Sequence, residues 1–210
     1  MSTAELAEEY IRTHKAVKEC LKEGLINYSA LARKISKELG IEKKSSRDAV
    51  MIATIRYAKK IKSGKSEEET IKNLLKNSSL EIKNKVSVYI LEKSVNLDDL
   101  IDIEKKARKK EEVFFSIEGT KSITLMISQN FDDEVKKIFK GKTLSNSHKN
   151  AVMIIKSPES IENVSGVLAY VSGLFHDNDV NIIESLSCWT DTIFIVKEDD
   201  VAKVMKFMQF

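Results

Sequence analysis

The sequence predicts an α+β protein in which a helical N-terminal domain precedes two copies of one smaller α+β unit. Up to residue 79 the apolar residues recur with the period of a helix, and after it they alternate with the period of a strand. The order strand, helix, strand, strand, helix then occurs twice, at an interval of about 65 residues. We therefore predict three domains, at residues 1–79, 80–148 and 149–210.

Only the N-terminal domain has a net positive charge. Residues 1–79 contain 17 Lys and Arg against 11 Asp and Glu, whereas residues 80–210 contain 18 against 21. Such an asymmetry indicates an anionic partner, most commonly nucleic acid, although a solvated lysine-rich face gives the same count.

Composition is typical of a globular cytoplasmic protein. The 210 residues are 42% hydrophobic, and no stretch reaches the roughly 20 uncharged apolar residues of a membrane helix. The N-terminus is acidic, where a signal peptide would be basic and then apolar. Cys20 and Cys188 lie outside any metal-binding spacing. We expect two free, half-buried thiols, no metal, no other cofactor and no membrane partner.

Three amphipathic helices are predicted in the N-terminal domain. Residues 3–22 carry one apolar stripe that ends at Gly24. A second helix starts with Ser29 as its N-cap and stops at Gly40, and a third follows the basic turn EKKSSR and runs through residues 49–61. Their apolar faces can bury one another as a bundle.

A hinge is predicted where this bundle ends. Residues 62–66, KSGKS, combine small and charged residues, which are typical of a loop. After them, Ser66 and Glu69 have the spacing of a capping box, which indicates the start of a short helix.

The first α+β unit contains three strands and two helices. In chain order we expect these elements at residues 86–90, 97–110, 113–117, 123–127 and 131–139. Asn96 is the expected cap of the first helix, and Gly119 and Thr120 are the expected hairpin turn. Residues 142–145 are the candidate for a fourth strand.

The second unit repeats this order. Its elements are expected at residues 151–155, 166–175, 181–189, 192–196 and 201–208. We predict that each unit forms its own antiparallel sheet with both helices on one face. The chain stops at Phe210, before the second unit could form a fourth strand. Its sheet edge must therefore be completed by another segment or by a partner.

Residues 158–184, PESIENVSGVLAYVSGLFHDNDVNIIE, resemble the first loop, helix and second strand of ACT domains, the amino-acid-sensing modules of aspartate kinases and other regulated enzymes. The resemblance implies ferredoxin-like βαββαβ units, a bound amino acid, and a homodimer or higher oligomer. Ser165 stands where the family usually has proline, and the first unit has no glycine at its matching turn. The candidate ligand-binding residues are Asn163, Val164, Ser165, Gly166, Val167, Leu168, Asn181 and Ile182.

The physical case for this ligand site does not need the family. Gly166 at the start of a helix lets a ligand approach backbone N–H groups, and the positive end of the helix dipole suits a carboxylate. Asn181 offers both a donor and an acceptor. A structural interpretation stays open, in which Ser165 only caps the helix and Asn181 only turns the chain.

Across its whole length the chain also resembles a group of archaeal proteins described as predicted regulators of amino-acid metabolism that contain an ACT domain. Besides the ACT segment, the resemblance includes INYSALARKISKELG and SRDAVMIATIRYAKK. It implies a role in regulation and little about mechanism.

The same N-terminal segments have the outline of a helix-turn-helix, with a first helix longer than in the simplest motifs. Double-stranded DNA is therefore a candidate partner, met by basic and hydroxyl side chains of the turn and the following helix. The candidate nucleic-acid contacts are Lys43, Lys44, Ser45, Ser46, Arg47, Arg56, Lys59 and Lys60. Lysine-rich faces more often lie in water, and that interpretation also stays open.

No motif of the commoner enzyme classes is present, since the sequence has no P-loop, dinucleotide-binding glycine pattern, HExxH or GxSxG. We therefore predict a non-catalytic, amino-acid-sensing regulator of amino-acid metabolism in which ligand binding at the ACT units alters DNA binding by the N-terminal domain. The alternative is an ACT-type allosteric module that docks on a separate metabolic enzyme without contacting DNA.

Overall fold

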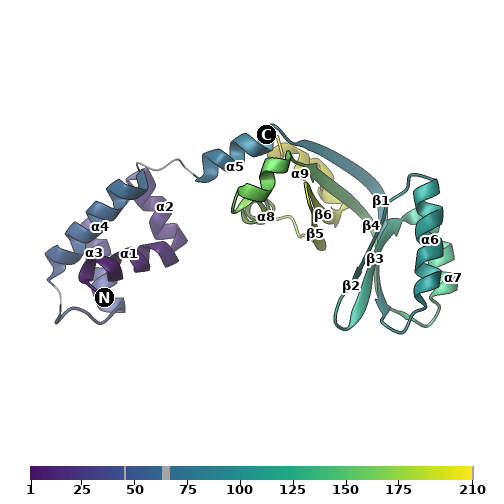
Figure 1. The fold of residues 1–210 in the computed structure, drawn as a ribbon, viewed down its shortest axis with the longest axis horizontal. Helices are drawn as coiled ribbons and strands as arrows, with labels where there is room; N and C mark the ends of the chain where they lie inside the picture. Colours follow the sequence, from purple (N-terminus) through teal and green to yellow (C-terminus); the bar gives the residue numbers. More distant parts are fainter. Residues whose placement is uncertain (45, 63–66, 210) are drawn as a thin grey trace. The chain divides into compact units, whose positions relative to one another are not determined.

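A computed structural model of the chain describes residues 1–44, 46–62 and 67–209 (Figure 1). The chain forms two compact units, Met1–Ser66 and Glu67–Phe210, which we call the helical unit and the sheet unit. The sheet unit begins before the boundary predicted at residue 79, because α5 (Glu67–Lys76) belongs to it. Ile71 and Leu75 of this helix are buried in the core of the sheet unit. Residues 63–66, with most of the predicted hinge and its Ser66 cap, lie outside the described residues.

Four helices surround one apolar core in the helical unit. They are α1 (Thr3–Thr13), α2 (Lys15–Glu23), α3 (Tyr28–Glu38) and α4 (Arg47–Lys62). The prediction of a single helix over residues 3–22 is wrong, because the helix breaks at His14, whose ring stacks on Tyr10 at 3.9 Å between centroids. Ile11 of α1 and Leu21 of α2 are both fully buried in this core.

The ends of these helices follow local chemistry. Gly24 ends α2 with a left-handed φ of 76°, as predicted. The predicted N-cap of the next helix, Ser29, is wrong, because the side chain of Asn27 accepts the capping bond from the backbone N–H of Ala30 at 3.0 Å. Among the described helices none is both long and apolar enough to cross a membrane.

The sheet unit contains the predicted element order twice after α5. The first run is β1 (Ser79–Glu92), α6 (Leu97–Lys109), β2 (Phe114–Glu118), β3 (Ser122–Ser128), η1 (Gln129–Phe131) and α7 (Asp132–Ile138). The second run is β4 (Thr143–Lys156), η2 (Glu159–Asn163), α8 (Val167–Asp177), β5 (Glu184–Cys188), β6 (Asp191–Lys197), η3 (Glu198–Asp200) and α9 (Val201–Phe207).

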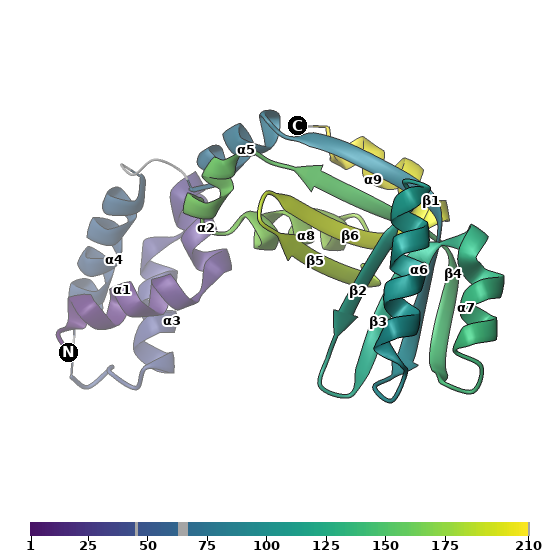
Figure 2. The same ribbon diagram turned by 45° about the vertical axis from the view of Figure 1, so that its right-hand side comes forward.

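The prediction of two separate sheets is wrong. All six strands form one antiparallel sheet in the order β2-β3-β1-β4-β6-β5. The physical reason is the length of β1 and β4, which have 14 residues each and pair with one another from Ser79↔Lys156 to Leu91↔Thr143. Each of these two strands therefore belongs to both halves of the sheet (Figure 2).

This pairing completes both halves. Residues 143–147 of β4 lie beside β1 as the fourth strand of the first half, at the position predicted for 142–145. Residues 79–83 of β1 pair with 152–156 of β4 and are the fourth strand of the second half. The missing strand therefore comes from the first part of β1, at the start of the first unit.

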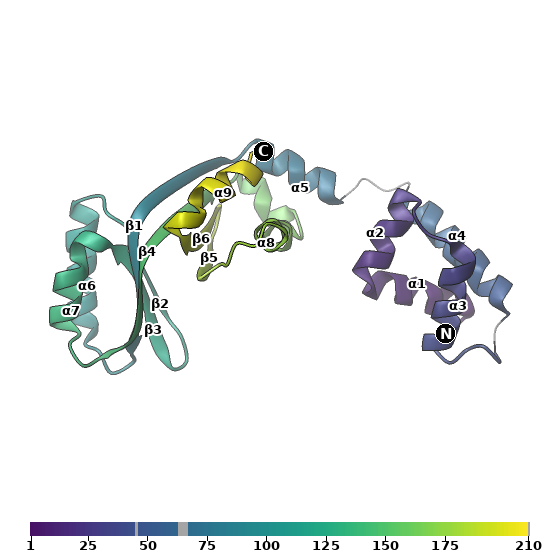
Figure 3. The ribbon, with the colours of Figure 1, turned by 180° about the vertical axis from the view of Figure 1, so that it is seen from behind.

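Helices cover one face of each half of the sheet, and a separate apolar cluster lies on the inner face. Helices α6 and α7 lie side by side against the first half (Figure 3). Tyr89 and Phe139 are buried in the core that these helices form with the sheet. Helices α5, α8 and α9 cover the second half around Phe175 and Phe194. A further cluster contains only strand and loop residues from both halves, among them Met126 of β3 and Ile195 of β6. The sheet thus curves as a half-barrel around its own apolar inner face.

Candidate functional site

The predicted ligand loop joins β4 to α8. It includes η2, and Gly166 stands at the N-cap of α8 with a left-handed φ of 83°. The first helical bond runs from the N–H of Tyr170 to the carbonyl of Gly166 at 2.9 Å. Within the described part of the chain no side chain caps this end, so the N–H groups of the first turn are left for solvent or a ligand.

One side of this loop is covered by α5. A β-carbon on Gly166 would lie 3.5 Å from Cδ1 of Ile71, which is ordinary van der Waals contact. The glycine is therefore required by its backbone conformation, while the space beside it would tolerate a methyl group.

The predicted ligand-binding residues differ in exposure. Asn163, Ser165, Gly166, Leu168 and Asn181 are exposed, Val164 and Ile182 are half-buried, and Val167 is buried. Val164 and Ile182 pack against the core of the second half.

The two ends of the predicted site do not meet within one chain. Gly166 precedes α8 and Asn181 follows it, and eleven helical residues rise about 16 Å. The sequence predicts a ligand site formed jointly by the start of α8 and Asn181. Because the sheet is continuous and Ile71 lies against the loop, the exposed end of α8 is the part of that prediction that still offers a binding surface.

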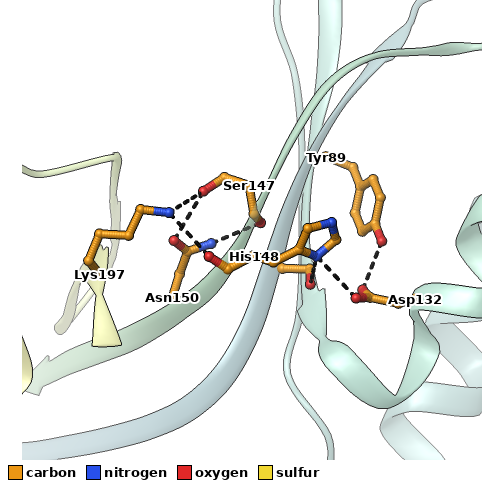
Figure 4. Close-up of polar contacts among 7 residues, drawn as sticks. Tyr89, Asp132, Ser147, His148, Asn150 and Lys197 are labelled. Carbon is orange, nitrogen blue, oxygen red and sulfur yellow. Dashed lines mark hydrogen bonds and ion pairs between the residues drawn. The ribbon is translucent and has the colours of Figure 1, made fainter. Parts of the chain in front are cut away.

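A polar cluster lies where the two halves of the sheet join (Figure 4). The sequence did not predict it. The phenol of Tyr89 donates to Asp132 Oδ1 at 2.8 Å, and His148 Nδ1 lies 3.1 Å from Asp132 Oδ2 and 2.8 Å from the hydroxyl of Ser87. Burial and then the bond to Asp132 raise the pKa of Tyr89. The cluster thus ties β1, β4 and the first turn of α7 together.

The cluster continues on the side of the second half. Lys197 Nζ donates to the hydroxyl of Ser147 at 2.7 Å and to the carbonyl of His148 at 3.1 Å. The amide of Asn150, which is fully buried, donates to the carbonyl of Ser147 at 2.9 Å. These bonds satisfy the backbone where β4 departs from a regular ladder, near left-handed Lys149.

Serine, histidine and aspartate meet in this cluster without the geometry of a catalytic triad. In a triad, the two imidazole nitrogens contact different partners, so that one takes the serine proton while the other is held by the carboxylate. Here the same atom, Nδ1 of His148, contacts both Ser87 and Asp132. Ser87 is also fully buried. The arrangement is that of a structural network.

The predicted nucleic-acid contacts fall in the helical unit. Ser46 caps α4, since its hydroxyl accepts from the N–H of Ala49 at 3.1 Å, and Ser45 lies outside the described residues. Lys60 pairs with Glu8 of α1 at 3.1 Å. The other predicted contacts are all exposed, namely Lys43, Lys44, Arg47, Arg56 and Lys59.

Two of these residues line a pocket between α1 and α4. Its volume is about 570 Å³, and its lining combines Arg56 and Lys60 with apolar groups such as Ile52, which is 48% exposed.

A group of three or more His, Cys, Asp or Glu side chains able to hold a metal does not occur among the described residues. Cys20 and Cys188 are both exposed, which corrects the expectation of half-buried thiols.

No family model and no curated protein matches the sequence. Among solved structures, the aspartate kinase of Clostridium acetobutylicum, described as an allosteric enzyme, is 17% identical with a TM-score of 0.50 over 62% of this chain and 33% of that chain. A putative C-terminal regulatory domain of aspartate kinase from Porphyromonas gingivalis is 10% identical over 62% and 94% of the two chains, with a TM-score of 0.45. The ligand-free regulatory subunit of aspartate kinase from Thermus thermophilus is 9% identical over 61% and 92%, with a TM-score of 0.48.

The likeness to the Clostridium enzyme supports an ACT-type fold. The match covers 62% of the 210 residues and the helical unit has only 66, so part of the matched length must lie in the sheet unit. The chain covers about a third of that kinase.

Proposed function

We propose that the sheet unit is an amino-acid-sensing allosteric module and that the chain is a non-catalytic regulator of amino-acid metabolism. The observation that carries this proposal is the uncapped start of α8 at left-handed Gly166, flanked by the exposed side chains of Asn163 and Ser165. The positive end of a helix dipole favours a carboxylate, and every free amino acid carries one. The ACT-type fold of the unit supports the same class of ligand.

In this proposal the protein acts as a homodimer or a higher oligomer. Asn181 is exposed but lies beyond the far end of α8 from Gly166 in its own chain. A second copy that brought its Asn181 to the loop would supply a donor and an acceptor for the amino and carboxylate groups of the ligand.

Helix α5 is the proposed route from the ligand to the helical unit. Ile71 of α5 lies against Gly166, and α5 begins at the first residue of the sheet unit. A ligand that favours one position of the loop would therefore bias the position of α5 within the sheet unit. A coupling free energy of about 1–3 kcal/mol is sufficient for useful control.

The helical unit is proposed to bind double-stranded DNA. Support comes from the exposed cations in the turn before α4 and along that helix, Lys43, Lys44, Arg47, Arg56 and Lys59. Such side chains contact phosphates and would make the affinity fall steeply as salt is added. Lys60 contributes less to this surface because it is paired with Glu8.

Docking on a separate metabolic enzyme, without contact to DNA, is the second candidate. One observation favours it, namely the pocket between α1 and α4. Ile52 and Ala53 form an apolar part of its lining beside Arg56. A mixed apolar and basic groove fits an acidic amphipathic segment of a protein better than it fits a phosphate backbone.

Titration calorimetry of the full chain against each free amino acid at millimolar concentration tests the sensing proposal. We expect one or a few amino acids to bind, and we expect Asn163→Ala and Asn181→Ala to weaken the binding. Asn146→Ala, which changes an exposed residue of β4, serves as the control and should bind as the wild type does. Absence of binding by every amino acid would refute the proposal.

A salt titration of binding to a random-sequence duplex separates the two candidate outputs. Affinity that falls steeply with salt and changes when the bound amino acid is present supports DNA binding. If no duplex binds at low salt, the DNA output is excluded and docking on an enzyme remains.

A further inference from the structure

A second pocket of the helical unit lies between α3 and the start of α4. It has a volume of about 410 Å³, and every residue along it is polar or charged. The lining residues are Arg33, Ser36, Lys37, Glu42, Ser46 and Arg47. Ser46 and Arg47 are also among the predicted nucleic-acid contacts, whereas Arg33, Ser36, Lys37 and Glu42 belong to no predicted site.

Three cations converge on it. Arg33 and Lys37 are one helical turn apart on α3, and Arg47 is the first residue of α4. No ion pair or hydrogen bond joins the side chains of these three to another residue in the described parts of the chain. Glu42 also lines the pocket, so the local balance of these charged side chains is positive.

Helix α4 presents its N-terminus here. The hydroxyl and the carbonyl of Ser46 accept bonds from Ala49 and Val50, at 3.1 and 3.3 Å. The N–H groups of Arg47 and Asp48 precede these and have no partner within an α-helix. The partial positive charge of a helix of 16 residues therefore adds to that of the side chains.

An independent observation comes from Ser36. The residue is only 5% exposed, and its hydroxyl has no hydrogen-bond partner among the described residues. A buried hydroxyl without a partner destabilises the fold, so native proteins rarely leave one in that state. A hydroxyl in the wall of a cationic pocket is satisfied when it donates to an oxygen of an anion.

We propose that the pocket between α3 and α4 is a phosphate-binding site, with Arg33, Lys37 and Arg47 as the cationic contacts and Ser36 as a hydroxyl donor. Guanidinium groups bind phosphate oxygens in bidentate fashion, and a phosphate at a helix N-terminus is a frequent arrangement. The volume exceeds that of a phosphate ion, so the phosphate can be part of a larger molecule. This site is independent of amino-acid sensing by the sheet unit.

Two sources of phosphate share this chemistry, namely a free phosphorylated molecule and the backbone of duplex DNA. We would titrate the full chain with inorganic phosphate by calorimetry and with a short random duplex by fluorescence anisotropy, both at low salt. Phosphate binding without duplex binding identifies the free molecule. Binding of both, with the same response to substitutions, identifies the DNA backbone.

Four substitutions make the test specific. Arg47→Gln and Ser36→Ala should each weaken phosphate binding, by about tenfold for the arginine. Glu42→Gln should strengthen it, because the carboxylate repels the anion. The control is Lys34→Gln, which removes a cation from α3 that pairs with Glu38 at 3.8 Å and does not line the pocket. Its affinity should stay within about twofold of wild type.

A thermal melt without ligand separates a binding role of Ser36 from a structural one. We expect Ser36→Ala to be as stable as wild type or more stable, because the substitution removes an unsatisfied polar atom. Weaker phosphate binding with unchanged stability supports the site. The inference is overturned if inorganic phosphate does not bind, or if Arg47→Gln and Ser36→Ala bind it as Lys34→Gln does.

Discussion

Ile71 of α5 lies against Gly166 at the start of α8, with its Cδ1 3.5 Å from the place where a β-carbon would stand on the glycine. This distance is ordinary contact, so an added methyl group would fit. The backbone is the stricter constraint, because Gly166 has a φ of 83°. Helix α5 and the loop before α8 are thus packed together, although about ninety residues separate them in the chain.

Replacing Gly166 with alanine should lower the free energy of unfolding by about 1–2 kcal/mol, the cost of placing a side chain in the left-handed region. Gly173→Ala is the matched control, since Gly173 lies inside α8 with nothing within 4 Å of its added methyl. That substitution should stabilise the protein by about 0.5–1 kcal/mol. Urea denaturation followed by circular dichroism measures both, and equal effects would contradict the role of the left-handed backbone.

The bond from Tyr89 to Asp132 should contribute measurably to stability. Tyr89 is fully buried and donates at 2.8 Å to a carboxylate that is 17% exposed, so Tyr89→Phe should cost about 1–2 kcal/mol. Tyr170→Phe removes a hydroxyl for which no hydrogen bond occurs among the described residues of the same unit. It should change stability by less than about 0.5 kcal/mol. Chemical denaturation would show similar losses for both variants if the bond were unimportant.

Tyr10 should make the helical unit sensitive to alkali. Burial, followed by its 2.7 Å bond to Glu38, raises the pKa of Tyr10 from 10.0 to about 12. In the unfolded chain the phenol ionises near pH 10, whereas in the folded chain it stays neutral. Its contribution is therefore complete below pH 10 and is lost as the pH rises towards 12.

The measurement for Tyr10 is the free energy of unfolding of the wild type and of Tyr10→Phe at several pH values across this window. The wild-type value should fall more steeply, because the phenylalanine variant has no phenol at this position to ionise. Parallel curves between pH 10 and pH 12 would show that the tyrosine does not control the alkaline transition.

Lys85 occupies the irregular point of β1. Its φ is 57°, and its N–H donates to a carboxylate oxygen of Glu198. Lys85→Gly should preserve or raise stability, while Lys85→Val should lower it by about 1–2 kcal/mol, because a β-branched residue is disfavoured in the left-handed region. Both variants lose the lysine side chain, so their difference reports whether position 85 accepts a β-branched side chain in the left-handed conformation.

Asn84→Val provides the control for Lys85, since it places the same β-branched residue at the exposed preceding position, which has no positive φ. Thermal melts should order the variants with Lys85→Val well below Asn84→Val. Equal melting temperatures would show that the left-handed conformation at Lys85 is not required.

The element order of the sheet unit could be predicted from sequence, but the joining of the strands could not. Val86, Val88 and Ile90 alternate clearly and mark the second part of β1. The first part has only Leu80 and Ile82 as half-buried apolar residues, and left-handed Lys85 then shifts the register. Leu80 and Ile82 pack against the core around Phe194, whereas Val86 and Val88 belong to the cluster of the inner face, so the two parts of β1 do not share one face of the sheet.

The polar cluster was beyond sequence reasoning for a different reason. Tyr89, Asp132 and His148 come from three elements, and nothing in the local pattern of any one of them indicates the others. The start of α8 could be located because Gly166 gives a local signal. That Asn181 lies at the other end of the helix follows from the length of α8, which separates the two residues in the chain.

The shared strands lead to a prediction about fragments. Residues 149–210, the predicted third domain, lack 79–83 of β1, which complete their sheet edge, and they lack α5. Ile71, Leu74 and Leu75 of α5 are buried in the same core as Phe194, so the fragment would expose a large part of that core to water. We expect the fragment 149–210 to show no dispersed amide spectrum by NMR and no cooperative melting. Residues 67–210, which contain both long strands and α5, should melt in one cooperative transition. If 149–210 alone gave a dispersed spectrum and a sharp transition, the first part of β1 would not be an integral strand of the second half.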